Sequence, residues 1–315
     1  MAMFDIYSYN DLSNRVDAKQ HRCIAIGNFD GVHLGHQAVL EKCVEISKQK
    51  ELKSTILTFE PHPRAFFNPS TPMQRLTLAH EKKQLLIDQA IDEVIILDFD
   101  AALSQLEAEN FVLDVLFEKL NAREIFVGTD FHFGKGRKGD VSLLQRLAKP
   151  HNVIINAIDK LSNDQSIDIS SSYIRNLLST GCVKEANALL GRFWSFTSQV
   201  YHGDKRGRDL GYPTANLHLR KDMNLAFGIY AVRIQYDGNI YGGVASYGRR
   251  PVFDNGEPLF EVHIFDFKSE IYGKTLKIEL IDWQRPELDF DSVESLITQM
   301  DRDSDQARKT LALNI

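Results

Sequence analysis

The first half of the chain alternates short apolar runs with longer segments of helical periodicity. Apolar runs occupy residues 22–27 (RCIAIG), 54–59 (STILTF) and 93–99 (EVIILDF), and a segment with apolar residues every three or four positions follows each run. The alternation continues through residues 123–128 and 152–158. Strands and helices in turn predict an α/β fold with a parallel sheet covered by helices.

The pattern changes after the helical segment at residues 171–193. Gly, Asp and Asn turns then separate short strands of alternating character, at residues 196–202, 229–236, 240–246, 259–267 and 275–283. Such strands predict an antiparallel barrel. A final helical segment follows, with Asp291 or Ser292 as its expected N-cap.

Length and composition favour two domains. The chain has 315 residues, more than a typical single domain, and is 43% hydrophobic, which is enough to bury two cores. We expect domains at residues 1–184 and 185–315. The formal net charge of −6 argues against nucleic acid as a partner.

Cysteine content and hydropathy bear on the compartment. The three cysteines are odd in number and form no CxxC pair, so we expect neither a disulfide framework nor a zinc site, and a reducing cytoplasm fits. No apolar stretch approaches the ~20 residues needed to span a bilayer. We therefore expect no membrane partner and no processed leader.

Residues 27–36 (GNFDGVHLGH) lie between an apolar run and a helical pattern, where a parallel sheet binds phosphates. Gly27, Gly31 and Gly35 permit close backbone approach. His33 and His36 are three apart and should share a helix face. Imidazoles beside a helix N-terminus can stabilise charge on the α-phosphate of a nucleotide. The alternative, two histidines without a functional role, is less compatible with the Gly-rich lead-in.

Residues 169–175 (ISSSYIR) form a second polar segment. Its serines can cap a helix, and Ser171 has a hydroxyl to spare for phosphate oxygens. Arg175 adds a fixed positive charge. Alone, the segment indicates only a helix cap, but a triphosphate needs cationic or N–H partners at both ends, so we pair it with the HxGH motif.

Residues 134–139 (GKGRKG) formally match the GxGxxG pattern of dinucleotide sites. The residues DFHF intervene between the strand REIFVG and the match, and Asp140 stands where a P-loop would have Lys. We therefore interpret the segment as a mobile basic loop over phosphates.

Residues 202–217 (HGDKRGRDLGYPTANL) join a basic Gly-rich loop to a PTAN segment. Pro213 restricts the backbone, and Thr214 and Asn216 can present oxygens on one side of an extended segment. Such hard ligands suit Mg²⁺, which also binds nucleotide phosphates. The basic side chains available for phosphate are Lys205, Arg206 and Arg208.

Residues 260–267 (FEVHIFDF) should form a strand with Glu261 and His263 on one face. A carboxylate among apolar neighbours is a candidate general base. Glu261 alone could equally be a surface residue on an edge strand, but beside PTAN we favour the base.

The N-terminal half resembles the HxGH nucleotidyltransferase superfamily with its Rossmann-like fold. TFEPHPR at 58–64 and VGTDFHFGKGRKGD at 127–140 make it similar to the FMN adenylyltransferase module of bacterial FAD synthetases. The resemblance implies catalytic His33, His36, Ser171 and Arg175. It implies ATP contacts from Gly27, Asn28, Phe29, Asp30 and Gly35. It implies flavin contacts from Phe59, Pro61, Pro63, Arg64, Asp130, Phe131 and Phe133. Ser172, Tyr173, Thr129 and His132 depart from the family pattern.

The C-terminal half resembles the riboflavin kinase family, also through GIYAV at 228–232 and GGVASYGRRPVF at 242–253. The resemblance implies a six-stranded antiparallel barrel with a C-terminal helix, Mg²⁺ near Thr214 and Asn216, and Glu261 as the base. It implies ATP contacts from Lys205, Arg208, Gly211 and Pro213. Ser246 and Val252 depart from the usual pattern.

Together the two resemblances indicate a bifunctional enzyme with ATP, riboflavin and FMN as small-molecule substrates. Two rivals differ in substrate or class. One is a transferase that acts on a different phosphate, such as a cytidylyltransferase, with the barrel as a specificity module. The other is a non-catalytic flavin carrier or flavin-sensing regulator, which would bind FMN tightly without turnover. The sequence leaves the oligomeric state open.

Overall fold

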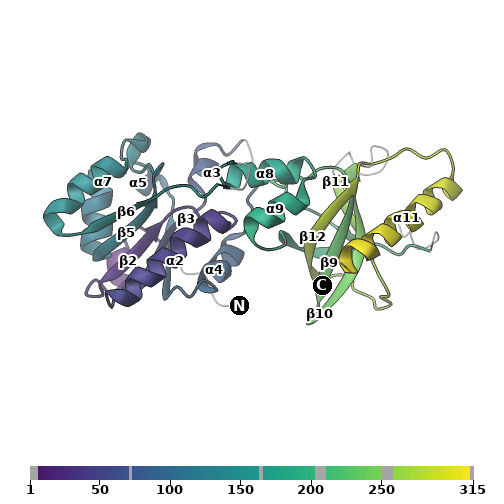
Figure 1. Ribbon diagram of the computed structural model, residues 1–315, viewed down its shortest axis with the longest axis horizontal. Coiled ribbons are helices and arrows are strands. Elements are labelled where there is room, and N and C mark those ends of the chain that lie inside the picture. The colour runs from purple at the N-terminus through teal and green to yellow at the C-terminus, as the bar shows by residue number, and fades with distance from the viewer. Residues whose placement is uncertain (1–5, 71–72, 163–165, 203–210, 250–257, 313–315) are drawn as a thin grey trace. The chain divides into compact units, whose positions relative to one another are not determined.

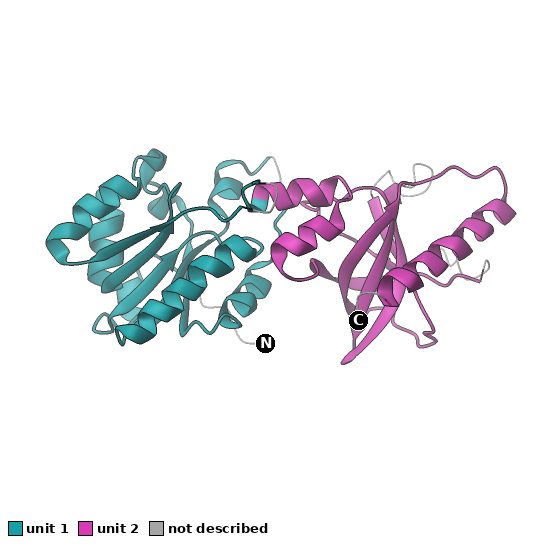
Figure 2. Cartoon of the chain, viewed as in Figure 1, with its two compact units in different colours: residues 1–171 teal, residues 172–315 magenta. Residues whose placement is uncertain are grey.

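The computed structural model describes residues 6–70, 73–162, 166–202, 211–249 and 258–312 (Figure 1). The chain divides into two compact units, Met1–Ser171 and Ser172–Ile315 (Figure 2). The boundary expected after residue 184 falls within a helix of the second unit and stays a prediction.

Unit 1 contains a six-stranded parallel sheet in the order β1-β4-β3-β2-β5-β6. Its strands are β1 (Ile6–Tyr7), β2 (Arg22–Ile26), β3 (Lys53–Glu60), β4 (Glu93–Asp98), β5 (Ala122–Gly128) and β6 (Ile154–Ile158). Its α-helices are α1 (Leu12–Arg15), α2 (Leu34–Gln49), α3 (Pro63–Phe67), α4 (Ala79–Ile87), α5 (Ala101–Ser104), α6 (Ala108–Asn110) and α7 (Val141–Ala148). Three further segments are the π-helix η1 (Phe111–Lys119) and the 3-10 helices η2 (Lys135–Arg137) and η3 (Lys149–His151). The predicted parallel α/β fold is confirmed.

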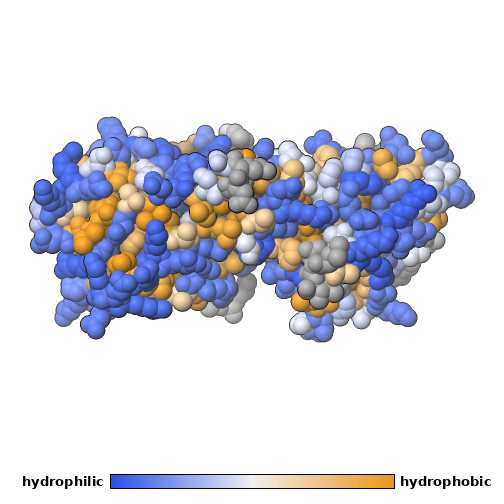
Figure 3. Space-filling model, viewed as in Figure 1, coloured by the Kyte–Doolittle hydropathy of each residue, from blue (hydrophilic) through white to orange (hydrophobic). Residues whose placement is uncertain are grey.

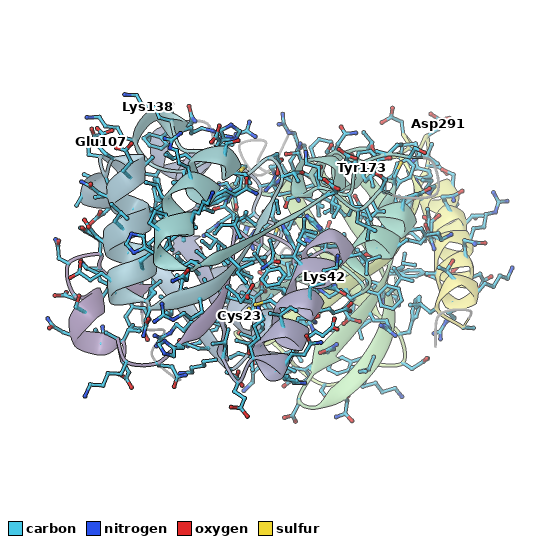
Figure 4. The ribbon with its side chains drawn as sticks, turned by 60° about the vertical axis from the view of Figure 1, so that its left-hand side comes forward. Cys23, Lys42, Glu107, Lys138, Tyr173 and Asp291 are labelled. Carbon is cyan, nitrogen blue, oxygen red and sulfur yellow. The ribbon has the colours of Figure 1, made fainter. Side chains whose placement is uncertain are left out.

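Alternate residues of each central strand pack under different helices, as the pleat requires. On β2, Cys23 and Ala25 join the core formed with α2 and α4, whereas Ile24 and Ile26 join the core formed with η1 and α7. Figure 4 labels Cys23 on β2 and Lys42 on α2. Over unit 1, apolar side chains show between hydrophilic ones on the face drawn in Figure 3.

Residues 108–120 have helical periodicity, but only the first turn is α-helical (α6), since η1 is a π-helix. Its buried residues, Phe111, Val112, Val115 and Leu116, recur at a spacing that suits either helix type. Periodicity in the sequence therefore could not separate the two.

Unit 2 is a closed antiparallel barrel in the order β10-β11-β8-β7-β12-β9, preceded by two helices and followed by one. Its strands are β7 (Ser195–Tyr201), β8 (Ala215–Leu217), β9 (Gly228–Tyr236), β10 (Asn239–Arg249), β11 (Pro258–Ile264) and β12 (Thr275–Arg285). Among the residues that the structure describes, its helices are α8 (Ser171–Ser179, whose first residue belongs to unit 1), α9 (Val183–Leu190) and α11 (Val293–Ala312). The six-stranded barrel and C-terminal helix expected from the resemblance are confirmed.

The C-terminal helix contacts the barrel through both apolar and charged side chains. Ala307 packs with Ala231, Phe265 and Ile281 on the outside of the barrel. Arg285 at the end of β12 donates two hydrogen bonds to the Asp303 carboxylate, of 2.8 and 2.5 Å. Of the two expected caps, Ser292 is the one observed, since its Oγ accepts from Ser295 N at 3.1 Å.

A buried cation joins the amino-terminal ends of the sheet in unit 1. Arg22, 1% exposed, donates to the carbonyl oxygens of Asp17, Gln20 and Leu120 and, at 2.8 Å, to the Glu93 carboxylate. Lys53 Nζ also donates to Glu93, at 2.9 Å. A buried guanidinium with every neighbour an acceptor is strongly held, and removal of one partner should be costly.

Replacing Glu93 with Gln should change how stability depends on pH. Burial raises the pKa of Glu93, but hydrogen bonds from Arg22 and Lys53 outweigh it and hold that pKa below its ordinary value. Folding therefore favours the ionised form. Its contribution is present above the unfolded-state pKa, about 4.3, and is lost as pH falls through the lower folded-state value. The stability difference between wild type and Glu93→Gln should thus shrink on acidification.

Thermal unfolding between about pH 7 and about pH 3 measures this difference, which we expect to be roughly 2 kcal/mol at neutral pH. Glu41, exposed on α2, gives the matched control Glu41→Gln. A Glu93→Gln effect that stays constant across this range would contradict the assignment.

Candidate active sites

The loop between β2 and α2 has an unusual backbone. Phe29, Gly31 and Val32 adopt φ angles of 48°, 85° and 40°. Glycine adopts such angles freely, but a β-branched residue such as Val32 does so only under strain, at a cost of about 1–3 kcal/mol. The turn predicted to hold phosphate is therefore held in a conformation that its sequence does not favour locally.

The two histidines of this loop come together at the start of α2. His33 is the N-cap, and its Nδ1 accepts from the backbone N of His36 at 3.3 Å. The two rings stack with centroids 3.6 Å apart and an interplanar angle of 18°. A Cβ on Gly35 would lie 3.2 Å from His33 Nδ1, so glycine leaves room for the ring. Because Nδ1 accepts, neutral His33 has its proton on Nε2. The structure brings together the imidazoles that the spacing paired, and their catalytic role stays a prediction.

Asp30 and Ser171 fix the middle of the loop. The Asp30 carboxylate accepts from the backbone N of Leu76 at 3.2 Å and of Thr77 at 3.1 Å. Thr77 Oγ1 in turn accepts from Gly31 N at 3.1 Å. Ser171 Oγ donates to the Asp30 carbonyl at 2.8 Å. These contacts give Asp30 a structural role that the sequence did not suggest.

Arg175 lies one turn beyond Ser171 on α8, within unit 2. Its Nη1 is 3.5 Å from Ser172 Oγ. Ser172 and Tyr173, which depart from the family pattern, precede it in the first turn of the same helix, where Figure 4 labels Tyr173.

An aromatic cluster lies at the carboxyl ends of β3 and β4. Phe99 packs edge-on against Phe59, Phe66 and Phe67, with centroid separations of 6.1, 5.4 and 5.8 Å. Phe67 is 58% exposed. Only Phe59 was predicted here; the adjacent FF pair was the signal that could have revealed the others. The three rings other than Phe67 are partly buried, and a partly exposed aromatic cluster of this kind suits a planar apolar ligand.

The other predicted flavin contacts of residues 58–64 lie just before α3 or in its first turn. Pro63 is the first residue of α3, His62 is its N-cap, and Arg64 is exposed. Pro61 lines a cavity of about 490 Å³, together with Glu60, Asp98 and Arg15 among others.

Asp130, Phe131 and Phe133 follow β5. Asp130 is exposed and forms an ion pair with Lys160 at 3.0 Å. Phe131 and Phe133 stack with centroids 5.3 Å apart, and Phe133 is 7% exposed. Backbone hydrogen bonds between Phe133 and Gly139, both 3.0 Å, close residues 134–139 into a turn.

The barrel gathers a second site where β8 pairs with β11. Asn216 is the register partner of Glu261, and Thr214 Oγ1 lies 3.4 Å from Glu261 Oε1. On the far side of β11, Ser246 of β10 is also opposite Glu261. The three residues predicted from the sequence are thus neighbours, because the short strand β8 is inserted next to β11.

Two contacts missed by sequence reasoning support the PTAN segment. His263 Nδ1 hydrogen-bonds the Pro213 carbonyl at 2.9 Å. Tyr212 packs on the His263 ring and donates to Asp301 of α11. Burial, and then this hydrogen bond, raise the pKa of Tyr212 to about 12. Gly211 and Pro213 are exposed, whereas Lys205, Arg206, Arg208 and Val252 lie outside the described residues.

The donors available for a metal are few and neutral. Within the described ranges, no group of three or more His, Cys, Asp and Glu side chains is arranged to hold an ion. The Thr214 hydroxyl and the Asn216 amide oxygen are hard donors, and so fit a cation such as Mg²⁺ that keeps waters and takes its other ligands from phosphates. Across the same described residues, no helix is long and apolar enough to cross a membrane.

Two family models match the chain. The FAD synthetase model matches residues 16–173, and the riboflavin kinase model matches residues 190–311. Among curated relatives, the bifunctional riboflavin kinase/FMN adenylyltransferase of Buchnera aphidicola subsp. Schizaphis graminum is 35% identical, covering 95% of this chain and 96% of the relative. The proteins of the same name from Pseudomonas fluorescens (37%; 93% and 94%) and Escherichia coli K12 (34%; 96% and 97%) are similarly close.

One solved structure resembles the whole chain. It has a TM-score of 0.85 and 30% identity, and covers 94% of this chain and 96% of its own. That protein is described as a macrolide-efflux protein from Streptococcus pneumoniae, whereas both family models and the curated relatives name flavin chemistry.

Proposed function

The chain belongs to the family of bifunctional riboflavin kinase/FMN adenylyltransferases, and from that premise we propose how its residues perform the two reactions. ATP phosphorylates riboflavin to FMN, and a second ATP adenylylates FMN to FAD. We assign adenylyl transfer to residues 1–184 and the kinase to residues 185–315. The observation that most supports this division is that each unit gathers one family motif: the stacked histidines in unit 1, and Thr214, Asn216 and Glu261 in unit 2.

In adenylyl transfer, an FMN phosphate oxygen attacks the α-phosphorus of ATP, and the bond from that phosphorus to the bridging oxygen of pyrophosphate breaks. His33 and His36 at the N-terminus of α2 stabilise the charge that develops, with His33 donating from Nε2. Ser171 and Arg175 contact the phosphates. FMN itself is the nucleophile, so no covalent enzyme intermediate forms.

The substrates occupy opposite sides of this chemistry. The loop backbone at Gly27, Asn28 and Gly35 approaches ATP, with Phe29 and Asp30 shaping the turn. Phe59 and its aromatic cluster contact the isoalloxazine ring, Arg64 binds the FMN phosphate, and Pro61, Pro63, Asp130, Phe131 and Phe133 complete the flavin side.

In the kinase reaction, Glu261 accepts the proton of the terminal ribityl hydroxyl. The oxygen of that hydroxyl attacks the γ-phosphorus of ATP, and ADP leaves. Thr214 and Asn216 would hold Mg²⁺, which when bound neutralises phosphate charge. Lys205, Arg208, Gly211 and Pro213 would contact this ATP. We propose a reducing cytoplasm as the setting, since all three cysteines are free thiols.

The variant His36→Ala should lose FAD formation and keep FMN formation. Loss of one donor to a developing charge typically costs ~10²–10³ in rate, while Glu261 and its neighbours belong to the other unit. Chromatography of flavins, with riboflavin or FMN supplied separately, measures both activities. His21, exposed just before β2, supplies the control His21→Ala. Equal loss of both activities in His36→Ala would refute the assignment.

Glu261→Gln should show the opposite pattern. An amide cannot accept the hydroxyl proton, so FMN formation should fall by ~10²–10⁴, whereas supplied FMN should still be converted to FAD. Glu270→Gln, in the exposed turn after β11, is the matched control. Kinase turnover at the wild-type rate in Glu261→Gln would remove this residue from the mechanism.

A further inference from the structure

Helix α4 places a buried ammonium group, that of Lys82, against the loop between β2 and α2, residues 27–33, which we call the nucleotide loop. The side chain of Lys82 is 6% exposed. Its Nζ donates to the Asn28 carbonyl at 3.3 Å, to Thr58 Oγ1 at 3.2 Å and to the Phe59 carbonyl at 3.3 Å. The Glu60 carboxylate lies 3.7 Å away. These four partners of the ammonium are all oxygen atoms, as a buried cation requires.

These oxygens come from two different segments. Asn28 belongs to the nucleotide loop, which leads to His33 and His36. The end of β3 contributes Thr58, Phe59 and Glu60, and it leads into residues 61–64; we call residues 58–64 the flavin-side segment. Thr58 Oγ1 also donates to the Asn28 carbonyl, at 3.2 Å. Lys82 therefore connects the parts of unit 1 that we assign to the two substrates.

The position of Lys82 follows from the sheet. Pairing of β2 with β3 ends at Ile26 and Leu57, and the last bond between them runs from Gly27 N to the Leu57 carbonyl at 3.2 Å. Beyond that point the chains diverge, and the Asn28 carbonyl has no donor from the β3 backbone. The ammonium and Thr58 supply those donors, in a loop whose φ angles at Phe29 and Val32 are strained.

Nearby carboxylates balance the positive charge of Lys82. Burial lowers the pKa of Lys82, and the nearby carboxylates of Glu60 and Asp30 act against that shift. Glu60 also pairs with Arg75, at 3.1 Å. A neutral side chain at position 82 would remove one partner from each of three groups: the Asn28 carbonyl, the Phe59 carbonyl and the Glu60 carboxylate.

We propose that Lys82 is a positioning residue for adenylyl transfer: it holds the Asn28 and Phe59 carbonyls together and so sets the nucleotide loop against the flavin-side segment. The proposal rests on the assignment of adenylyl transfer to this unit. It places Lys82 in contact with neither substrate, so its effect is on the geometry in which they react.

The test compares Lys82→Met with Lys42→Met in the full-length protein. Lys42 is exposed on α2, the helix that follows the same loop (Figure 4). Steady-state kinetics give kcat and KM for ATP and FMN, per folded molecule as judged by circular dichroism. Riboflavin phosphorylation by the same preparation is the internal control. Since displacement of reacting groups by ~1 Å can cost ~10²-fold, we expect kcat for FAD formation to fall ~10–100-fold in Lys82→Met. The KM values should change less, and the kinase rate should stay within about twofold.

A second variant keeps the test decisive if Lys82→Met fails to fold. Thr58→Val keeps the shape of a fully buried side chain but removes its bonds to Lys82 and Asn28, and should lower kcat for FAD formation ~3–10-fold. FAD formation at the control rate in both variants would overturn the proposal, as would a loss shared equally with the kinase, which indicates only a structural role. Absence of FAD formation in the wild type would instead reject the function on which the proposal rests.

Discussion

Two parallel strands, β2 and β3, stop pairing at Gly27, and the backbone groups beyond that point need other partners. The candidate active site of unit 1 lies in the loop that follows, where other residues supply those partners. The loop turns sharply, with Val32 in a strained conformation, and delivers His33 to the start of α2 with its ring stacked on His36. The residues that hold it come from several segments: Thr77 binds Asp30 and Gly31, Ser171 binds the Asp30 carbonyl, and Lys82 and Thr58 bind the Asn28 carbonyl. The strained conformation is stable because several buried hydrogen bonds to the loop offset its energetic cost.

The two units deal with nucleotide phosphates in different ways. Unit 1 has two stacked imidazoles at the N-terminus of α2, where we propose that charge on an α-phosphate is stabilised. Unit 2 presents a hydroxyl and an amide beside a carboxylate, those of Thr214, Asn216 and Glu261, and we propose that these groups hold a hydrated cation and accept a proton. One chain can therefore transfer an adenylyl group and a phosphoryl group with separate machinery.

Much of this could be predicted from the sequence. The alternation of strands and helices predicts the parallel sheet, and the spacing of His33 and His36 predicts that their rings meet. The barrel strands were also visible, except β8, whose three residues are too short for a periodic signal. That strand is what places Asn216 opposite Glu261.

The supporting residues could not be predicted in this way. Lys82 reads as a surface lysine on an amphipathic helix, and Thr77 as a loop residue, because their partners are distant in sequence and lie where strands diverge. The ATP contact expected of Asp30 stays a prediction, whereas the hydrogen bonds from the backbone of Leu76 and Thr77 to its carboxylate had no signal in the sequence. Such roles depend on tertiary contacts that no local pattern encodes.

The central claim, that this chain performs both flavin reactions in sequence, is tested most directly by a time course. The purified protein is incubated with riboflavin, ATP and Mg²⁺, and the flavins are separated by chromatography. The account predicts that FMN appears first and is then converted to FAD. Riboflavin that persists unchanged, with added FMN also unreacted, would contradict it and favour a flavin-binding regulator.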